Sequence, residues 1–157
     1  MNVFMNYNKE DNMKNLFIIL CLLISTFTFA QDQRNFVKWV SDKTFDEKVT
    51  GYGAYEDHDD HDVIVVEFYA EFNKDNAFKD WAKIDKLDGV KYYRCNIANS
   101  PQLKKDLKIR MAPTILLYIR GDAYIKFTAK ASLDLKCPVD YDKLVRAIEV
   151  VRIESQY

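Results

Sequence analysis

Few side chains in this sequence have the type and spacing that chemistry requires, and the densest group is an acidic run that contains both histidines. His58 and His61 lie in the sequence EDHDDHD, which spans residues 56–62. Imidazole and carboxylate groups are ligands of zinc, copper and nickel, so the two histidines are weak candidates for a metal site. The run has no cysteine, and a solvated loop explains its composition. We therefore predict no metal and no other cofactor.

The cysteines are a second source of reactivity. The chain has three of them, Cys21, Cys95 and Cys137. A thiolate is the nucleophile of thiol–disulfide exchange, so Cys95 and Cys137 define one functional hypothesis, a residual or monothiol oxidoreductase activity. We identify no Gly-rich phosphate-binding loop, Ser-His-Asp signature or pair of catalytic carboxylates in the sequence.

A third candidate site lies in the segment VIVVEFYAEFNKDNAFKDW, residues 63–81, where an apolar strand runs into a predicted helix. This segment resembles the thioredoxin superfamily, and most closely the protein disulfide isomerase type, whose strand reads VEFYA before a Trp-Cys-x-x-Cys. Residues 67–70 match that strand, and Phe72 stands in for the tryptophan. Asn73 and Asn76 occupy the positions of the two cysteines. Because an amide cannot attack a sulfur, the resemblance implies a scaffold without dithiol chemistry.

A second block, KIRMAPTILLY at residues 108–118, resembles the cis-proline loop and following strand of the same superfamily. The resemblance implies that Pro113 follows a cis peptide bond and that the backbone of Ala112 pairs with an extended peptide. It also implies a shallow apolar groove, which would be lined by Tyr69, Phe72, Asn73, Asn76, Met111, Ala112, Pro113 and Thr114.

Charged and polar residues near this groove have structural interpretations. Glu67 lies on an otherwise apolar strand, where a carboxylate is costly unless it is paired or protonated. In the superfamily this acid relays protons to the buried cysteine, and Arg94 aligns with a nearby lysine. We therefore predict a buried ion pair between Glu67 and Arg94. At the start of the next helix, Asn73 or Asp75 is expected to cap free backbone N–H groups.

The N-terminal part of the chain has the pattern of a secretory signal peptide. Residues 13–31, MKNLFIILCLLISTFTFAQ, carry one lysine, an apolar run and small residues before an expected cut after Ala30. We expect Met13 to be the true start, residues 1–30 to be an extension plus leader, and residues 31–157 to form one domain of a periplasmic or secreted protein. An uncleaved membrane anchor is the alternative. A lipoprotein anchor at Cys21 is disfavoured because Leu20 precedes it, where a small residue is needed.

The remaining pattern alternates between strands and helices. It predicts four helices. The first is capped by Ser41 or Asp42, a short third helix is capped by Ser100, and the last is capped by Asp140. The second helix follows Asn76, and its apolar face is formed by Phe78, Trp81, Ile84 and Leu87. Strands are predicted at residues 36–40, 63–70, 90–97, 115–119 and 124–128, the last two joined as a hairpin. This order favours an α/β thioredoxin fold, a central mixed β-sheet flanked by helices on both faces. In that strand order Cys95 and Cys137 lie far apart, which implies no disulfide between them.

The function that this sequence predicts is binding. The formal net charge of −1 gives no indication of nucleic acid or an anionic membrane as a partner. The resemblance implies a redox-inactive thioredoxin-like domain that binds an extended polypeptide, in a chaperone-like or scaffold role. The alternative is a thiol–disulfide oxidoreductase that uses Cys95 or Cys137, and a third option is a structural subunit of a larger assembly.

Overall fold

The structure is a computed structural model in which residues 37–55, 63–130 and 135–154 are described. The predicted leader and the acidic run with His58 and His61 lie outside these ranges. None of the described helices is both long and apolar enough to cross a membrane.

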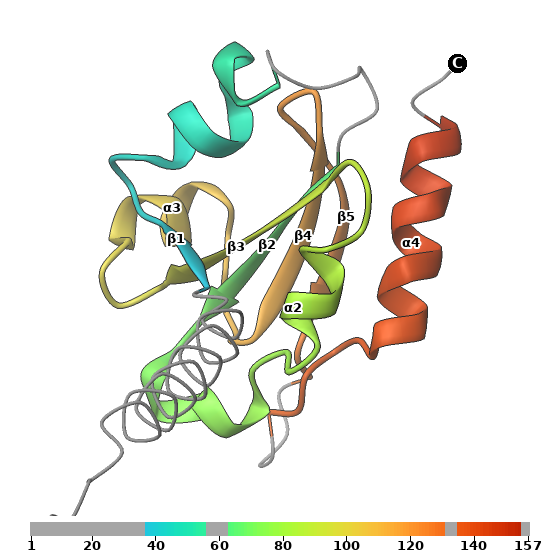
Figure 1. The fold of residues 1–157 in the computed structure, drawn as a ribbon. Helices are drawn as coiled ribbons and strands as arrows, with labels where there is room; N and C mark the ends of the chain where they lie inside the picture. The colour runs from blue at the N-terminus through green and yellow to red at the C-terminus, as the bar shows by residue number, and fades with distance from the viewer. Residues whose placement is uncertain (1–36, 56–62, 131–134, 155–157) are drawn as a thin grey trace, which may run out of the picture. The chain divides into compact units, whose positions relative to one another are not determined.

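A five-stranded mixed sheet forms the centre of the fold (Figure 1). Its strands are β1 (Lys38–Val40), β2 (Val63–Tyr69), β3 (Val90–Asn96), β4 (Thr114–Ile119) and β5 (Asp122–Thr128), in the spatial order β1-β3-β2-β4-β5. Strands β1, β2 and β3 are parallel, whereas β4 is antiparallel to both β2 and β5. All residues of β2 are buried, as expected for an apolar central strand that is covered on both faces.

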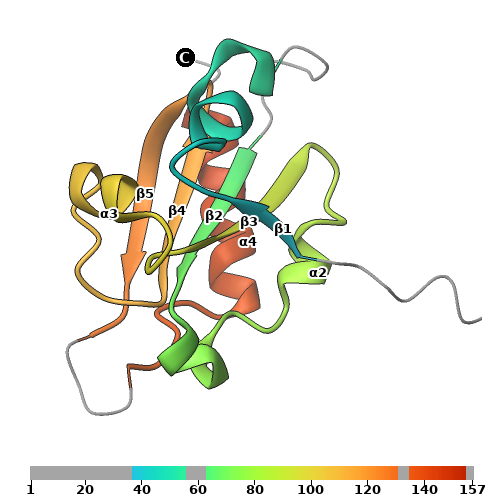
Figure 2. The same cartoon turned by 90° about the vertical axis from the view of Figure 1, so that its left-hand side faces the viewer.

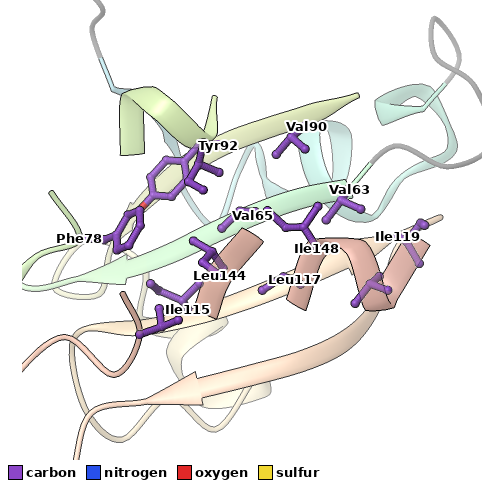
Figure 3. Close-up of a cluster of buried hydrophobic side chains, with 13 residues drawn as sticks. Val63, Val65, Phe78, Val90, Tyr92, Ile115, Leu117, Ile119, Leu144 and Ile148 are labelled. Atoms are coloured by element: carbon purple, nitrogen blue, oxygen red, sulfur yellow. The ribbon is translucent and has the colours of Figure 1, made fainter. Parts of the chain in front are cut away.

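Two layers of helices cover the sheet. On one face, the helices α2 (Trp81–Ile84) and α4 (Tyr141–Glu154) pack on apolar side chains of alternate strand positions, which Figure 3 shows as one cluster. On the other face, the π-helical turn η1 (Asp46–Thr50) and the helix α3 (Pro101–Asp106) pack on the intervening positions. Figure 2 shows α3 and α4 on opposite sides of the sheet. A short 3₁₀ turn, η2 (Tyr52–Ala54), follows η1.

The helix predicted after Asn76 is shorter than expected. A 3₁₀ segment, η3 (Glu71–Asn76), follows β2, its backbone is non-helical at Asn73, and α2 has only four residues. The backbone N–H of Phe78 donates to the Glu67 carboxylate at 2.8 Å. This contact ties the chain to β2 and buries Phe78 before the helix begins, so the apolar spacing arises without a continuous helix.

Two of the predicted caps are also corrected. The side chain of Ser100 makes no capping bond to α3. The carboxylate of Asp42, distant in sequence, instead accepts hydrogen bonds from the N–H groups of Gln102 at 3.1 Å and Leu103 at 2.9 Å. Asp42 therefore caps α3 and not the turn that follows β1. The predicted cap at Asp140 is confirmed, because its Oδ1 accepts the N–H of Lys143 at 2.8 Å.

The β4–β5 hairpin forms as predicted. Arg120 and Gly121 in its turn have φ angles of 50° and 87°. A tight hairpin turn with positive φ suits the twist of the strands. Gly121 is required there for a second reason, since a Cβ at this position would lie 2.4 Å from the carbonyl oxygen of Thr50.

Candidate functional site

The candidate site lies at the C-terminal end of β2, where η3 meets the loop that precedes β4. The peptide bond between Ala112 and Pro113 in this loop is cis, as expected. The carbonyl oxygen of Pro113 accepts a hydrogen bond from the N–H of Ala129 at 3.1 Å, which fixes the loop against the chain that leaves β5.

Two asparagine amides hold the site together, and we call this arrangement the asparagine clasp. Asn73 Nδ2 donates to the carbonyl oxygens of Ala112 at 2.8 Å and Leu135 at 3.0 Å. Asn76 Nδ2 donates to Asn73 Oδ1 at 2.7 Å. Both N–H donors of the Asn73 amide are used by loops that are distant in sequence, and its oxygen accepts the Asn76 amide. The capping role expected of Asn73 or Asp75 stays a prediction.

The two segments of the predicted groove therefore lie together, but the backbone carbonyl expected to bind a peptide is already hydrogen-bonded. The carbonyl of Ala112, which was expected to pair with a peptide, already accepts the Asn73 amide. Ala112 is 2% exposed, and Tyr69, Pro113 and Thr114 are also buried. Asn73, Asn76 and Met111 are half-buried, and Phe72 is the most accessible, with 79% of this residue exposed. Phe72 therefore contributes the most accessible side chain of the predicted groove.

A cavity of about 350 Å³ lies beside the clasp. Residues 75–80 line one part of it, and Lys136, Cys137, Val139, Asp140 and Tyr141 line the rest. Among the predicted groove residues only Asn76 contributes to this lining. Cys137 therefore lies close to the segment that ends η3 and precedes α2. No periodicity in the sequence indicates where the loop before the last helix lies, so the contact could not be inferred from it.

Both cysteines of the described chain are free thiols with raised pKa values. Burial is the main cause for Cys137, the Val139 carbonyl opposes it, and the negative charge of Glu67 adds to the rise. The Cys137 thiol donates to that carbonyl at 3.3 Å. Burial also raises the pKa of Cys95, against a smaller opposing effect of the Ser100 hydroxyl. A raised pKa lowers the thiolate fraction at neutral pH.

The carboxylate of Glu67 is fully buried and has three donors. Its Oε1 accepts the Phe78 N–H at 2.8 Å, and its Oε2 accepts the Tyr92 hydroxyl at 2.8 Å and Arg94 Nε at 2.7 Å. The ion pair expected between Glu67 and Arg94 is therefore present. Burial, followed by the nearby Glu67 charge, raises the pKa of Tyr92 well above its ordinary value.

Aromatic side chains flank the site on the β1 side. The rings of Trp39 and Tyr69 pack edge to face with centroids 5.7 Å apart, and the guanidinium of Arg94 lies 5.3 Å from the centroid of the Tyr69 ring. The Tyr69 hydroxyl donates to Glu71 at 2.5 Å, which is the main cause that raises the pKa of Tyr69 to about 12. Trp39 is 48% exposed, so it and Phe72 present apolar surface at this end of the sheet.

Metal binding has no site within the ranges that the structure describes, because no three His, Cys, Asp or Glu side chains there are grouped to hold an ion. His58 and His61 lie outside those ranges, so their weak candidacy stays a prediction.

Comparison with known proteins identifies the fold. Neither a protein-family model nor a curated protein matches the sequence. Among solved structures, a thioredoxin of Malassezia sympodialis, the allergen Mala s 13, is 20% identical with a TM-score of 0.54, and the match covers 74% of this chain and 93% of that one. A thioredoxin of Plasmodium falciparum is 18% identical with a TM-score of 0.54, covering 73% and 98%. A mutant thioredoxin of Halobacterium salinarum is 18% identical with a TM-score of 0.55, covering 73% and 89%. The chain has the thioredoxin fold, which confirms the predicted fold class.

Proposed function

We propose that this is an exported, redox-inactive thioredoxin-like protein that binds a polypeptide partner in a chaperone-like or scaffold role. The observation that carries the proposal is the asparagine clasp. Dithiol exchange requires a thiolate that forms a mixed disulfide, and the amides of Asn73 and Asn76 can form none. The Asn73 N–H groups instead hold the loops at Ala112 and Leu135, and the Asn76 amide donates to Asn73 Oδ1.

The state of Glu67 supports the same interpretation. A proton relay needs a carboxylate with access to the group that titrates. Both carboxylate oxygens of Glu67 already accept hydrogen bonds from donors of Phe78, Tyr92 and Arg94. We therefore assign Glu67 a structural role in which it fixes the chain after η3.

Binding is supported by two exposed aromatic side chains, Phe72, which precedes Asn73, and Trp39, which packs on Tyr69. Exposed aromatic residues are typical anchors of protein interfaces. An incoming strand can pair with the carbonyl of Ala112 only if it displaces the Asn73 amide. Side-chain contact with Phe72 is therefore expected to contribute more to binding than backbone pairing does. The assignment to an exported fraction rests on the leader pattern of residues 13–31.

An insulin-reduction assay with dithiothreitol tests the chemical part of this proposal. The wild-type protein should give no turnover above the reagent alone. The double change Asn73→Cys, Asn76→Cys, made in a Cys137→Ser background, should gain measurable turnover because Asn73 already contacts the loop that holds cis-Pro113. Wild-type turnover that survives both Cys95→Ser and Cys137→Ser would contradict the proposal.

A pull-down from the exported fraction tests the binding part. We expect the wild-type protein to retain a discrete partner and Phe72→Ala to lose most of it. The matched control is Tyr124→Ala, which removes another exposed aromatic side chain, 46% exposed, from β5. Equal losses in both variants, or none in Phe72→Ala, would place the partner elsewhere.

A second candidate function, monothiol chemistry, is favoured by one observation: Cys137 lines the cavity beside residues 75–80. Its raised pKa opposes this function at neutral pH. Reduction of a glutathionylated peptide separates the two candidates. Monothiol chemistry predicts turnover that Cys137→Ser abolishes and Cys95→Ser leaves intact, whereas the binding proposal predicts none.

A further inference from the structure

Positive side chains lie on α3, on the loop that follows it, and on and just after β5, whose Lys126 contacts the end of α3. We call them the basic face, which consists of Lys104, Lys105, Lys108, Arg110, Lys126 and Lys130. All six residues are exposed. Lys126 joins the two elements, because its Nζ donates to the carbonyl oxygens of Leu107 at 2.9 Å and Lys108 at 3.3 Å. The face is therefore built on a fixed contact and not only on mobile side chains.

No carboxylate of the described residues is paired directly with the basic face. The carboxylates nearest in sequence or on the same helix have other partners. Asp106 accepts both of its hydrogen bonds from the Gln102 amide, at 2.9 Å each, and Asp42 caps the N-terminus of α3.

The positive groups are close enough to affect one another. The pKa of Lys126 is lowered, first by burial and then by the charges of Arg110 and Lys108. Like charges that lie together without carboxylates repel each other, and a partner that supplies carboxylates removes this repulsion. The formal net charge of the whole chain is −1, so the excess of positive charge is local.

We infer that the basic face binds an acidic segment of the polypeptide partner, an inference that rests on the proposed function and names the chemistry of that partner. Arg110 lies two residues before Ala112, and the N–H of Ala129 bonds Pro113, so both Arg110 and Lys130 border the loop of the clasp. A chain that contacts Phe72 and continues past this loop reaches the basic face. Nucleic-acid-binding domains are basic overall, which this chain is not, so a short run of carboxylates is the better fit.

The test is binding of a fluorescein-labelled peptide of ten glutamates, measured by anisotropy at low and at physiological salt. The wild-type protein should bind the peptide, and the affinity should fall as salt rises. The double change Arg110→Glu, Lys130→Glu should weaken binding about tenfold or more, because two attractive contacts become repulsive. Neither of these exposed side chains makes a hydrogen bond or ion pair within the described residues, so the variant should stay folded, which circular dichroism checks.

The matched control is Lys86→Glu, Arg146→Glu, which makes the same change of net charge with exposed residues outside the basic face. It should keep the affinity within about twofold, since only distant, screened charges change. Equal losses in both variants, no binding by the wild type, or tighter binding of a single-stranded oligonucleotide of matched charge would overturn the inference. If the peptide does not bind while Phe72→Ala still loses its partner, the proposed function stands and the acidic partner class alone is excluded.

Discussion

Glu67 shows how a single buried charge can be accommodated in an apolar strand. Three donors surround its carboxylate, and one of them, Arg94, is itself held by the carbonyl oxygen of Phe78 at 3.3 Å and by the ring of Tyr69. Burial of a charge is costly unless each of its groups is satisfied. The site therefore depends on Arg94 as much as on Glu67.

Replacement of Arg94 with methionine should lower the free energy of unfolding by about 3–5 kcal/mol, because it leaves a buried carboxylate without its counter-charge. Urea unfolding measures this value. The control is Lys74→Met, which removes an exposed ion pair to Glu71 with a separation of 3.5 Å and should leave the stability nearly unchanged. Similar midpoints for both variants would mean that the Glu67 site is not protected from water.

Two substitutions of Asn73 distinguish the contribution of its hydrogen bonds to stability from that of its side-chain volume. Asn73→Ala should cost about 1–3 kcal/mol, because the carbonyl oxygens of Ala112 and Leu135 lose their donor. Asn73→Asp should cost more although its shape is unchanged, because a carboxylate would then face two carbonyl oxygens. Asn99→Ala is the exposed control, for which a small change is expected. A stable aspartate variant would contradict the clasp.

At the scale of elements, hydrophobic patterns predict where a segment lies better than which backbone it adopts. Leu144, Ile148 and Val151 are buried on α4 as their spacing predicts. Phe78 and Ile84 are also buried as predicted, yet they do not share a helix, because the Phe78 N–H is taken by Glu67. A bond between a strand and the following loop leaves no local signal in the sequence.

The cap of α3 by Asp42 gives a prediction at this scale. Asp42→Ala should destabilise the protein by about 1 kcal/mol, as the loss of a helix N-cap does, although Asp42 is far from the helix in sequence. Ser100→Ala, at the position that sequence rules favour, should cost less because its side chain makes no capping bond. Thermal unfolding of the two variants ranks them, and a greater loss for Ser100→Ala would reverse the assignment.

At the scale of the whole molecule, tyrosines contribute to an alkaline limit of stability. The pKa of Tyr69 is raised to about 12, and those of Tyr92 and Tyr118 are raised mainly by burial. Between pH 10, the ordinary value, and the higher folded value, the folded state binds more protons than the unfolded state. Stability should therefore be intact below pH 10 and fall as the pH rises above it.

Tyr69→Phe tests this linkage. The variant keeps the ring contacts with Trp39 and Arg94 but loses the hydroxyl that donates to Glu71. We expect its free energy of unfolding to fall less steeply with pH between 10 and about 12 than that of the wild type. Urea unfolding at several alkaline pH values provides the comparison. Identical slopes would show that Tyr69 does not titrate differently in the two states.

The sequence was sufficient for the fold class and for the gathering of η3 with the cis-proline loop. It was not sufficient to predict which atoms of these segments form hydrogen bonds with each other. The contact of Asn73 with Ala112 and Leu135, and the approach of Cys137 to the cavity, are set by how loops distant in sequence close on each other. Such contacts follow from tertiary packing, which residue types alone do not encode locally.

The stretch from Lys38 to Thr50 has a consequence for where the domain can be shortened. It supplies β1, which covers one edge of β3, and Asp42, which caps α3, while the Thr50 carbonyl abuts Gly121 of the hairpin. A chain that begins at residue 51 would leave β3 as an open edge, and unpaired edges promote pairing between molecules. We expect such a truncation, or a proteolytic cut in this stretch, to promote aggregation of the domain.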